Sequence, residues 1–110
     1  DYLSLELSFI IANQMFSPLD KLLINPTRLI IMSVLTKVDN CDFNYLKKVT
    51  ETTQGNLSIQ LKKLKESHYI SIEKSFENNY PKTSCSITKI GVKAFEDHFT
   101  NLKNYQDLKL

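Results

Sequence analysis

The chain is poor in residues that interrupt regular structure, with only two glycines and three prolines among its 110 residues. This scarcity disfavours a disordered tail and indicates an ordered globular protein. There are also only two cysteines, Cys41 and Cys85, and no CxxC pair, so the sequence indicates no disulfide framework. The apolar run over residues 3–11 is interrupted by Glu6 and is too short to span a bilayer. We expect a soluble cytoplasmic protein with reduced thiols and no membrane partner.

The charge balance excludes little by itself. The net charge is +2, which is a weak argument for a nucleic-acid partner, so the positions of the lysines must carry any such argument. A length of 110 residues suits one domain with a modest core and is too short for two domains.

Residues 1–18 are predicted to form an N-terminal helix. Leu5, Phe9 and Ala12 recur at helical spacing, and neighbouring apolar residues widen the face beyond a narrow stripe. This broad face can be completed by a second copy of the chain or can pack on its own domain.

The next segment contains two signals for helix starts and a short connection. Asn25-Pro26 begins one helix, and after a loop over residues 38–41, Asp42 caps a short helix. Thr53 can cap a further helix after a connection of three or four residues. This is the spacing of a helix-turn-helix.

The helix predicted after Thr53 has two different faces. Leu57, Leu61 and Leu64 form one apolar stripe. The other side is small, polar and basic, which suits a helix lying in the major groove of DNA. An ordinary amphipathic surface helix is the alternative that this pattern alone leaves open.

The period then changes from helix to strand. Residues 69–74 and 83–87 alternate between apolar and polar side chains around a polar segment at 76–82, which predicts a β-hairpin with a loop there. Thr88 caps a final helix with Val92, Phe95, Phe99 and Leu102 on one face, and residues 103–110 extend it or form a tail.

The order of helix, helix, helix, hairpin and helix resembles the winged-helix transcriptional regulators of the MarR/ArsR-like superfamily, small single-domain type. The resemblance covers residues 19–102, which are most of the chain, and rests on the segments 25–29, 42–46, 55–64, 69–70, 87–91 and 94–95. It implies an α+β fold that is mainly α, a winged helix-turn-helix with a β-hairpin wing and additional terminal helices. It also implies a homodimer that binds double-stranded DNA.

The resemblance places recognition helix 53–66 in the major groove and wing 76–82 on the backbone or minor groove. The candidate DNA-binding residues on these two elements are Thr53, Gln54, Gly55, Asn56, Ser58, Ile59, Lys62, Lys63, Asn78, Asn79 and Lys82. We expect Asn56 and Ile59 to read bases and the lysines to hold phosphate. Gly55 either lets a phosphate approach the helix or packs tightly on the preceding helix. Relatives usually carry an arginine in the wing, and this wing has none.

Other functions find less support. No nucleophile and base pattern indicates an enzyme, and Cys85 and the Asp97-His98 pair are better explained as a buried thiol and a surface pair than as metal ligands, so we expect no cofactor and no metal. Arg28 is expected to form a local ion pair or to touch backbone. The residues expected in a dimer interface come from both terminal helices: Leu5, Phe9, Ala12, Phe99 and Leu102. The rival function is a winged helix used for association with other proteins.

Overall fold

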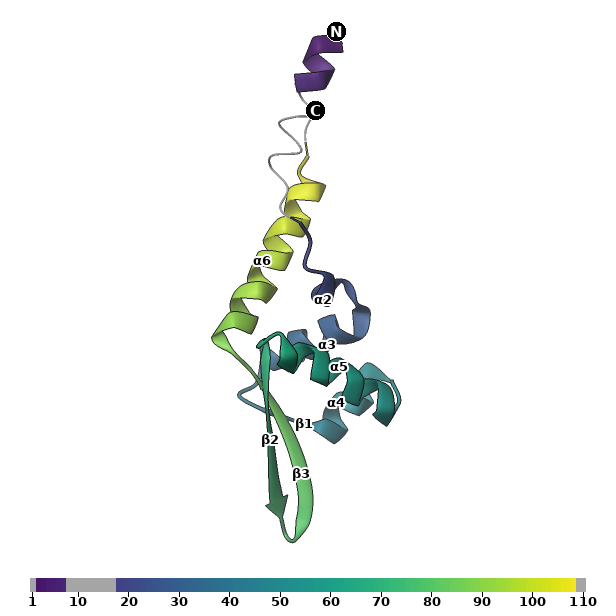
Figure 1. The fold of residues 1–110 in the computed structure, drawn as a ribbon, viewed down its shortest axis with the longest axis vertical. Coiled ribbons are helices and arrows are strands. Elements are labelled where there is room, and N and C mark those ends of the chain that lie inside the picture. The colour runs from purple at the N-terminus through teal and green to yellow at the C-terminus, as the bar shows by residue number, and fades with distance from the viewer. Residues whose placement is uncertain (1, 8–17, 109–110) are drawn as a thin grey trace.

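The computed structural model describes residues 2–7 and 18–108 (Figure 1). Residues 2–7 are helical. The remaining elements follow in the order α2 (Lys21–Ile24), α3 (Pro26–Leu35), β1 (Cys41–Asp42), α4 (Phe43–Thr50), α5 (Gln54–Glu66), β2 (Ile70–Glu77), β3 (Tyr80–Ile87) and α6 (Lys89–Gln106). The predicted α+β winged-helix arrangement, mainly α with a β-hairpin, is confirmed.

The core lies where α3, α4 and α5 meet the base of the sheet. Leu57, Leu61 and Leu64 of α5 are between 0% and 3% exposed, which confirms the predicted apolar stripe. They join the other buried apolar side chains, which are Leu23, Ile31, Met32, Leu35, Cys41, Leu46, Ile70 and Cys85. Full burial of a leucine or isoleucine side chain stabilises the folded state by about 1.5–3 kcal/mol, so this cluster fixes the position of α5 in the domain.

All four predicted helix starts are confirmed by side-chain caps. The side chain of Asn25 accepts a hydrogen bond from the Arg28 N–H at 3.0 Å, and that of Asp42 accepts one from the Asn44 N–H at 3.3 Å. The hydroxyl oxygens of Thr53 and Thr88 accept from the N–H groups three residues later at 3.1 and 3.0 Å. Each cap satisfies a backbone donor that the first helical turn leaves free.

The hairpin differs from the prediction in its length. The segment 76–82, expected as a loop, belongs mostly to the strands, because Phe76 pairs with Pro81 and Glu77 with Tyr80. Only Asn78 and Asn79 turn the chain, with φ values of 52° and 67°. Positive φ at both central residues is what a two-residue hairpin turn requires, and Asn tolerates it. The hairpin is therefore a long, regular projection.

Two short elements were not predicted. Cys41, expected in a loop, lies in β1, which pairs antiparallel with β3 so that Cys41 is opposite Cys85 and the strand order is β1-β3-β2. Helix α2 has only four residues. A two-residue strand and a one-turn helix are too short for periodicity to reveal them.

Helix α6 is anchored at its first turn. The Thr88 N–H donates to the Tyr69 carbonyl at 3.0 Å, and a Cβ placed on Gly91 would stand 2.2 Å from that same oxygen. Further along, α6 extends to Gln106, which confirms that part of the C-terminal segment continues the helix. His98 is only 3% exposed, so the prediction of a surface Asp-His pair is wrong: Asp97 alone faces solvent, where it pairs with Lys93.

Helix α6 and the β2–β3 hairpin extend toward opposite ends of the molecule (Figure 1). Within residues 2–7 and 18–108, the structure contains no helix with the length and apolar character needed to cross a membrane.

Candidate nucleic-acid interface

Helices α4 and α5 form the helix-turn-helix that the spacing predicts. Helix α4 ends at Thr50, and the residue after it, Glu51, adopts a left-handed conformation with φ 52° and ψ 36°. Thr53 then caps α5. This tight reversal holds α5 at the molecular surface, while its leucine stripe is buried beneath.

The outward face of α5 carries most of the residues predicted to bind DNA. Ile59 is 54% exposed, a large fraction for an isoleucine in a well-packed domain. The same face exposes Thr53, Gln54, Gly55, Ser58, Lys62 and Lys63. The surface therefore combines amide, hydroxyl, ammonium and methyl groups, which are the chemical groups that contact phosphates and base edges.

A groove of about 490 Å³ runs between α5 and the hairpin. Three lysines from the two elements line it: Lys62, Lys65 and Lys74, together with Gln54 and Ser58. Lys65 is absent from the residues that the sequence suggests, although it lies seven positions after Ser58 and so shares its side of the helix. The groove gathers positive charge that the overall charge of the chain does not reveal.

A chain of hydrogen bonds inside the protein holds the start of α5. The Arg28 guanidinium donates to the Gln60 side-chain oxygen and, through Nε, to the Leu22 carbonyl at 2.7 Å. Gln60 donates to Asn56 Oδ1 at 3.0 Å, and Asn56 Nδ2 donates to Thr52 Oγ1 at 2.7 Å. Arg28 is only 9% exposed, and its guanidinium is engaged by groups within the domain.

This network changes the interpretation of Asn56. The sequence suggests that its amide reads an adenine edge, whereas the structure engages one of its N–H groups and its oxygen within the protein. Asn56 is partly buried. Its established contacts therefore position the first turn of α5, and Gln54 and Ser58 are the more accessible polar groups on that turn.

Gly55 lies in open space. A Cβ placed on it would have no heavy atom within 4 Å apart from its own local helix backbone, so tight packing against the preceding helix does not explain this glycine. Glycine within a helix costs about 0.5–1 kcal/mol relative to alanine. The sequence offers two explanations for Gly55, tight packing on the preceding helix and close approach of a phosphate to the start of α5. The second explanation remains.

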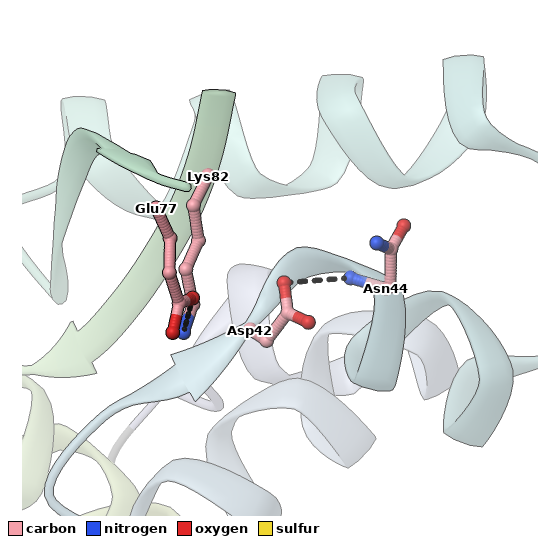
Figure 2. A network of polar contacts seen from close by, with 4 residues as sticks. All are labelled: Asp42, Asn44, Glu77 and Lys82. Atoms are coloured by element: carbon pink, nitrogen blue, oxygen red, sulfur yellow. Dashed lines mark hydrogen bonds and ion pairs between the residues drawn. The ribbon is translucent and has the colours of Figure 1, made fainter. Parts of the chain in front are cut away.

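The wing holds its one tip cation in an ion pair. Lys82 Nζ lies 2.9 Å from Glu77 Oε2, and Figure 2 shows the two side chains side by side on the hairpin. The hydrogen bond that the Lys82 ammonium donates to Glu77, together with the negative charge of Glu77, raises the pKa of Lys82, with a smaller contribution from Asp42. Lys82 therefore stays charged, and Glu77 places a negative charge beside it on the exposed hairpin.

The two cysteines are buried in the sheet, which confirms the prediction for Cys85. Burial, with the nearby Cys41 and Asp42, raises the pKa of the Cys85 thiol to about 11. Burial and the adjacent Asp42 also raise the pKa of Cys41. Among the residues that the structure describes, no group of three His, Cys, Asp or Glu side chains is arranged to hold a metal ion.

The predicted dimer residues within the described chain have exposed side chains. Leu5 is 66% exposed, Phe99 46% and Leu102 37%. Phe9 and Ala12 lie outside the described residues. Helix α6 therefore presents an apolar face that the single chain leaves accessible to water.

Comparison with known proteins places this architecture among nucleic-acid binders. A family model described as a winged helix DNA-binding domain matches residues 27–106. An uncharacterized protein of Methanocaldococcus jannaschii is 38% identical over 71 residues, which are 64% of this chain and 77% of that protein.

Solved structures show the same fold. A transcriptional regulator homologue from Pyrococcus horikoshii OT3 is 29% identical with a TM-score of 0.72, over 78% of this chain and 85% of its own. A MarR family transcriptional regulator from Silicibacter pomeroyi matches with a TM-score of 0.62 and 17% identity, over 96% of this chain and 64% of its own. The winged-helix fold that the resemblance implies is thereby confirmed.

Proposed function

Since the chain belongs to the family of winged helix DNA-binding domains, we propose that it is a sequence-specific, homodimeric regulator of transcription. In this proposal α5 enters the major groove of double-stranded DNA, and the hairpin reaches the backbone or the minor groove. The observation that carries the proposal is the groove between α5 and β2–β3, where Lys62, Lys65 and Lys74 come together around a path open to solvent.

Phosphate contacts are assigned to the lysines of this groove and to Lys63 beside it. Ammonium groups act as point charges toward phosphate oxygens and carry little sequence information. Gly55 supports a further phosphate contact, since the first turn of α5 has free space above its backbone, and backbone N–H groups at a helix start attract anions.

Base reading is assigned to the first two turns of α5. Gln54 can form paired hydrogen bonds with an adenine edge, Ser58 can bond to several bases, and the exposed Ile59 can pack on a thymine methyl group. These side chains project from a helix that the leucine stripe and the Arg28–Gln60 hydrogen bond hold in place. The backbone of the helix is therefore already ordered before DNA binds, which lowers the entropic cost of binding.

Salt dependence tests this proposal. Duplex binding is measured by fluorescence anisotropy over a range of salt concentrations for the natural chain and for the variant Lys62→Ala with Lys63→Ala. Each phosphate contact contributes about 0.9 to the steepness with which log affinity falls against log salt concentration. The double variant is therefore expected to have a slope that is less steep by about 1.8 and to bind more weakly.

A charge-matched variant, Lys37→Ala with Lys93→Ala, removes two exposed lysines outside the interface and should keep the slope of the natural chain. If the natural chain binds no duplex even at low salt, the proposal is wrong, and the rival function in protein association is favoured. Equal slopes for the two double variants would also contradict it, because the overall charge and not the groove would then govern binding.

The homodimer places two copies of α5 on one duplex. A two-fold symmetric dimer presents its recognition helices about one helical turn of DNA apart, so the expected operator is a pseudo-palindrome. The exposed apolar residues Phe99 and Leu102 of α6 support this part of the proposal, since a surface of this kind is suited to a second copy.

A further inference from the structure

The tip of the hairpin exposes two aromatic side chains, Phe76 at 79% and Tyr80 at 75%. A phenylalanine gains about 1.5–3 kcal/mol when it is fully buried, so a position near the end of a projecting hairpin is unfavourable for it in the isolated chain. Neither residue contributes to the buried core.

The two aromatic residues lie on opposite faces of the hairpin. Phe76 pairs with Pro81 and Tyr80 pairs with Glu77 in adjacent positions of the register, and successive positions of a strand face opposite sides. The face of Phe76 also carries Ile70, which is 2% exposed, then the partly buried Ile72 and then Lys74. Phe76 is therefore the outermost residue of the face that turns toward α5.

Phe76 lies beyond the groove, two residues after Lys74 on β2. Lys74 lines the groove opposite Lys62 and Lys65, and Phe76 follows it on the same face of β2. One DNA backbone separates a major groove from a minor groove. If these lysines hold one DNA backbone, the major groove lies on the side of that backbone that faces α5. The minor groove then lies on the other side, next to the hairpin tip.

The tip has little charge with which to contact that minor groove. Lys82 is paired with Glu77, and the chain's only arginine, Arg28, is buried in the domain. What the tip offers on the face toward α5 is an exposed phenyl ring. Apolar wedges such as Phe partly unstack base pairs in the minor groove and bend the duplex toward the major groove.

We propose that Phe76 inserts between base pairs of the minor groove as an apolar wedge, so that the wing reads the deformability of the DNA. The inference rests on the proposed function, since it requires that α5 occupy the adjacent major groove. It assigns recognition to steps that unstack readily, such as TA, and not to hydrogen-bonded base edges.

The test uses the full chain and a short synthetic duplex with a central run of TA steps, in which 2-aminopurine replaces one adenine and dyes label the two ends. The natural chain is expected to raise the 2-aminopurine emission, which reports unstacking, and to shorten the distance between the dyes. Phe76→Ala should abolish both signals and weaken binding by about 10- to 100-fold.

Two further variants separate a wedge from other contacts. Tyr80→Ala removes an equally exposed aromatic ring from the opposite face and should preserve affinity, unstacking and bending. Phe76→Arg should restore binding through charge, with a steeper salt dependence by about 0.9 in the slope, while the unstacking signal stays absent. Since both side chains are exposed, thermal unfolding should be unchanged in all three variants.

The outcomes distinguish this inference from the function on which it rests. If the natural chain binds no duplex at low salt, the proposed function fails and the wedge fails with it. If the natural chain binds but Phe76→Ala leaves affinity, emission and dye distance unchanged, the wedge alone is overturned, and Phe76 serves a partner other than DNA. Equal losses of affinity for Phe76→Ala and Tyr80→Ala would also overturn it, because aromatic rings on both faces of the hairpin tip would then contribute equally to binding.

Discussion

The two glycines stand in opposite surroundings, although both lie in the first turn of a helix. Gly91→Ala would place a Cβ 2.2 Å from the Tyr69 carbonyl oxygen, which is backbone and cannot move aside, so we expect a loss of about 1–3 kcal/mol or more in the free energy of unfolding. Gly55→Ala meets no neighbour and should raise it by up to about 1 kcal/mol, while weakening duplex binding. Urea unfolding and duplex titration of the two variants measure both effects.

Each variant serves as the control of the other, since the chemical change is the same and both positions lie in the first turn of a helix. A Gly55→Ala variant that binds duplex as tightly as the natural chain would show that no phosphate approaches the helix there. A Gly91→Ala variant of unchanged stability would contradict the close contact between α6 and the Tyr69 carbonyl.

Residue roles that depend on local spacing could be predicted from the sequence, and roles that depend on distant contacts could not. Thr53 caps the helix that begins at the next residue, so a local pattern suffices. The Arg28–Gln60 hydrogen bond joins residues 32 positions apart, and nothing near Gln60 in the chain indicates a buried guanidinium partner. The amide of Asn56 has local partners, Thr52 and Gln60, each four residues away, but the buried guanidinium that fixes Gln60 comes from a distant part of the chain.

At the scale of elements, a single side-chain contact ties α2 to the start of β2. The Tyr69 hydroxyl donates to Asp20, and the other carboxylate oxygen of Asp20 caps α2 by accepting from the Leu22 N–H at 2.9 Å. Burial, with the hydrogen bond and charge of Asp20, raises the pKa of Tyr69 from 10.0 to about 12. The folded protein thus holds the phenolic proton more tightly than the unfolded chain does.

This shift predicts how stability depends on alkaline pH. Because the folded pKa is raised, the stabilisation is fully present below pH 10 and is lost as pH rises through about 12. The difference in unfolding free energy between the natural chain and Tyr69→Phe should therefore shrink over this range, as measured by urea unfolding at successive pH values. A difference that stays constant would show that Tyr69 does not titrate with a raised pKa in the folded state.

The hairpin shows why element boundaries were harder to predict than element types. Alternation identified both strands, but Pro81 and the polar residues around it suggested a loop over 76–82. The structure accommodates Pro81 in β3 beyond the two residues that pair with β1, where only β2 lies beside the strand. Proline is tolerated where a strand has a free edge. The consequence is functional, since the longer hairpin carries Phe76 outward on a regular strand.

At the scale of the whole molecule, two surfaces of different chemistry lie on different elements. The groove of lysines lies between α5 and the hairpin, whereas α6 extends toward the opposite end (Figure 1) and exposes Phe99 and Leu102. Association through α6 would leave the groove open in both copies. This separation is what the proposed function requires, since one chain would have to bind a duplex and a second copy at the same time.

The apolar face of α6 therefore predicts the oligomeric state. We expect the natural chain to be a dimer at micromolar concentration by light scattering and the variant Phe99→Glu with Leu102→Glu to be a monomer, because association would bury four carboxylates without partners.

Ile90→Glu is the matched control for this prediction. Ile90 is 58% exposed on α6 and lies nine residues before Phe99, about half a turn around the helix, so this variant should remain a dimer. Removal of residues 1–16 should weaken the dimer, since Leu5 is exposed as well. A natural chain that is monomeric at these concentrations would contradict the assignment, and its α6 face would then require a different partner.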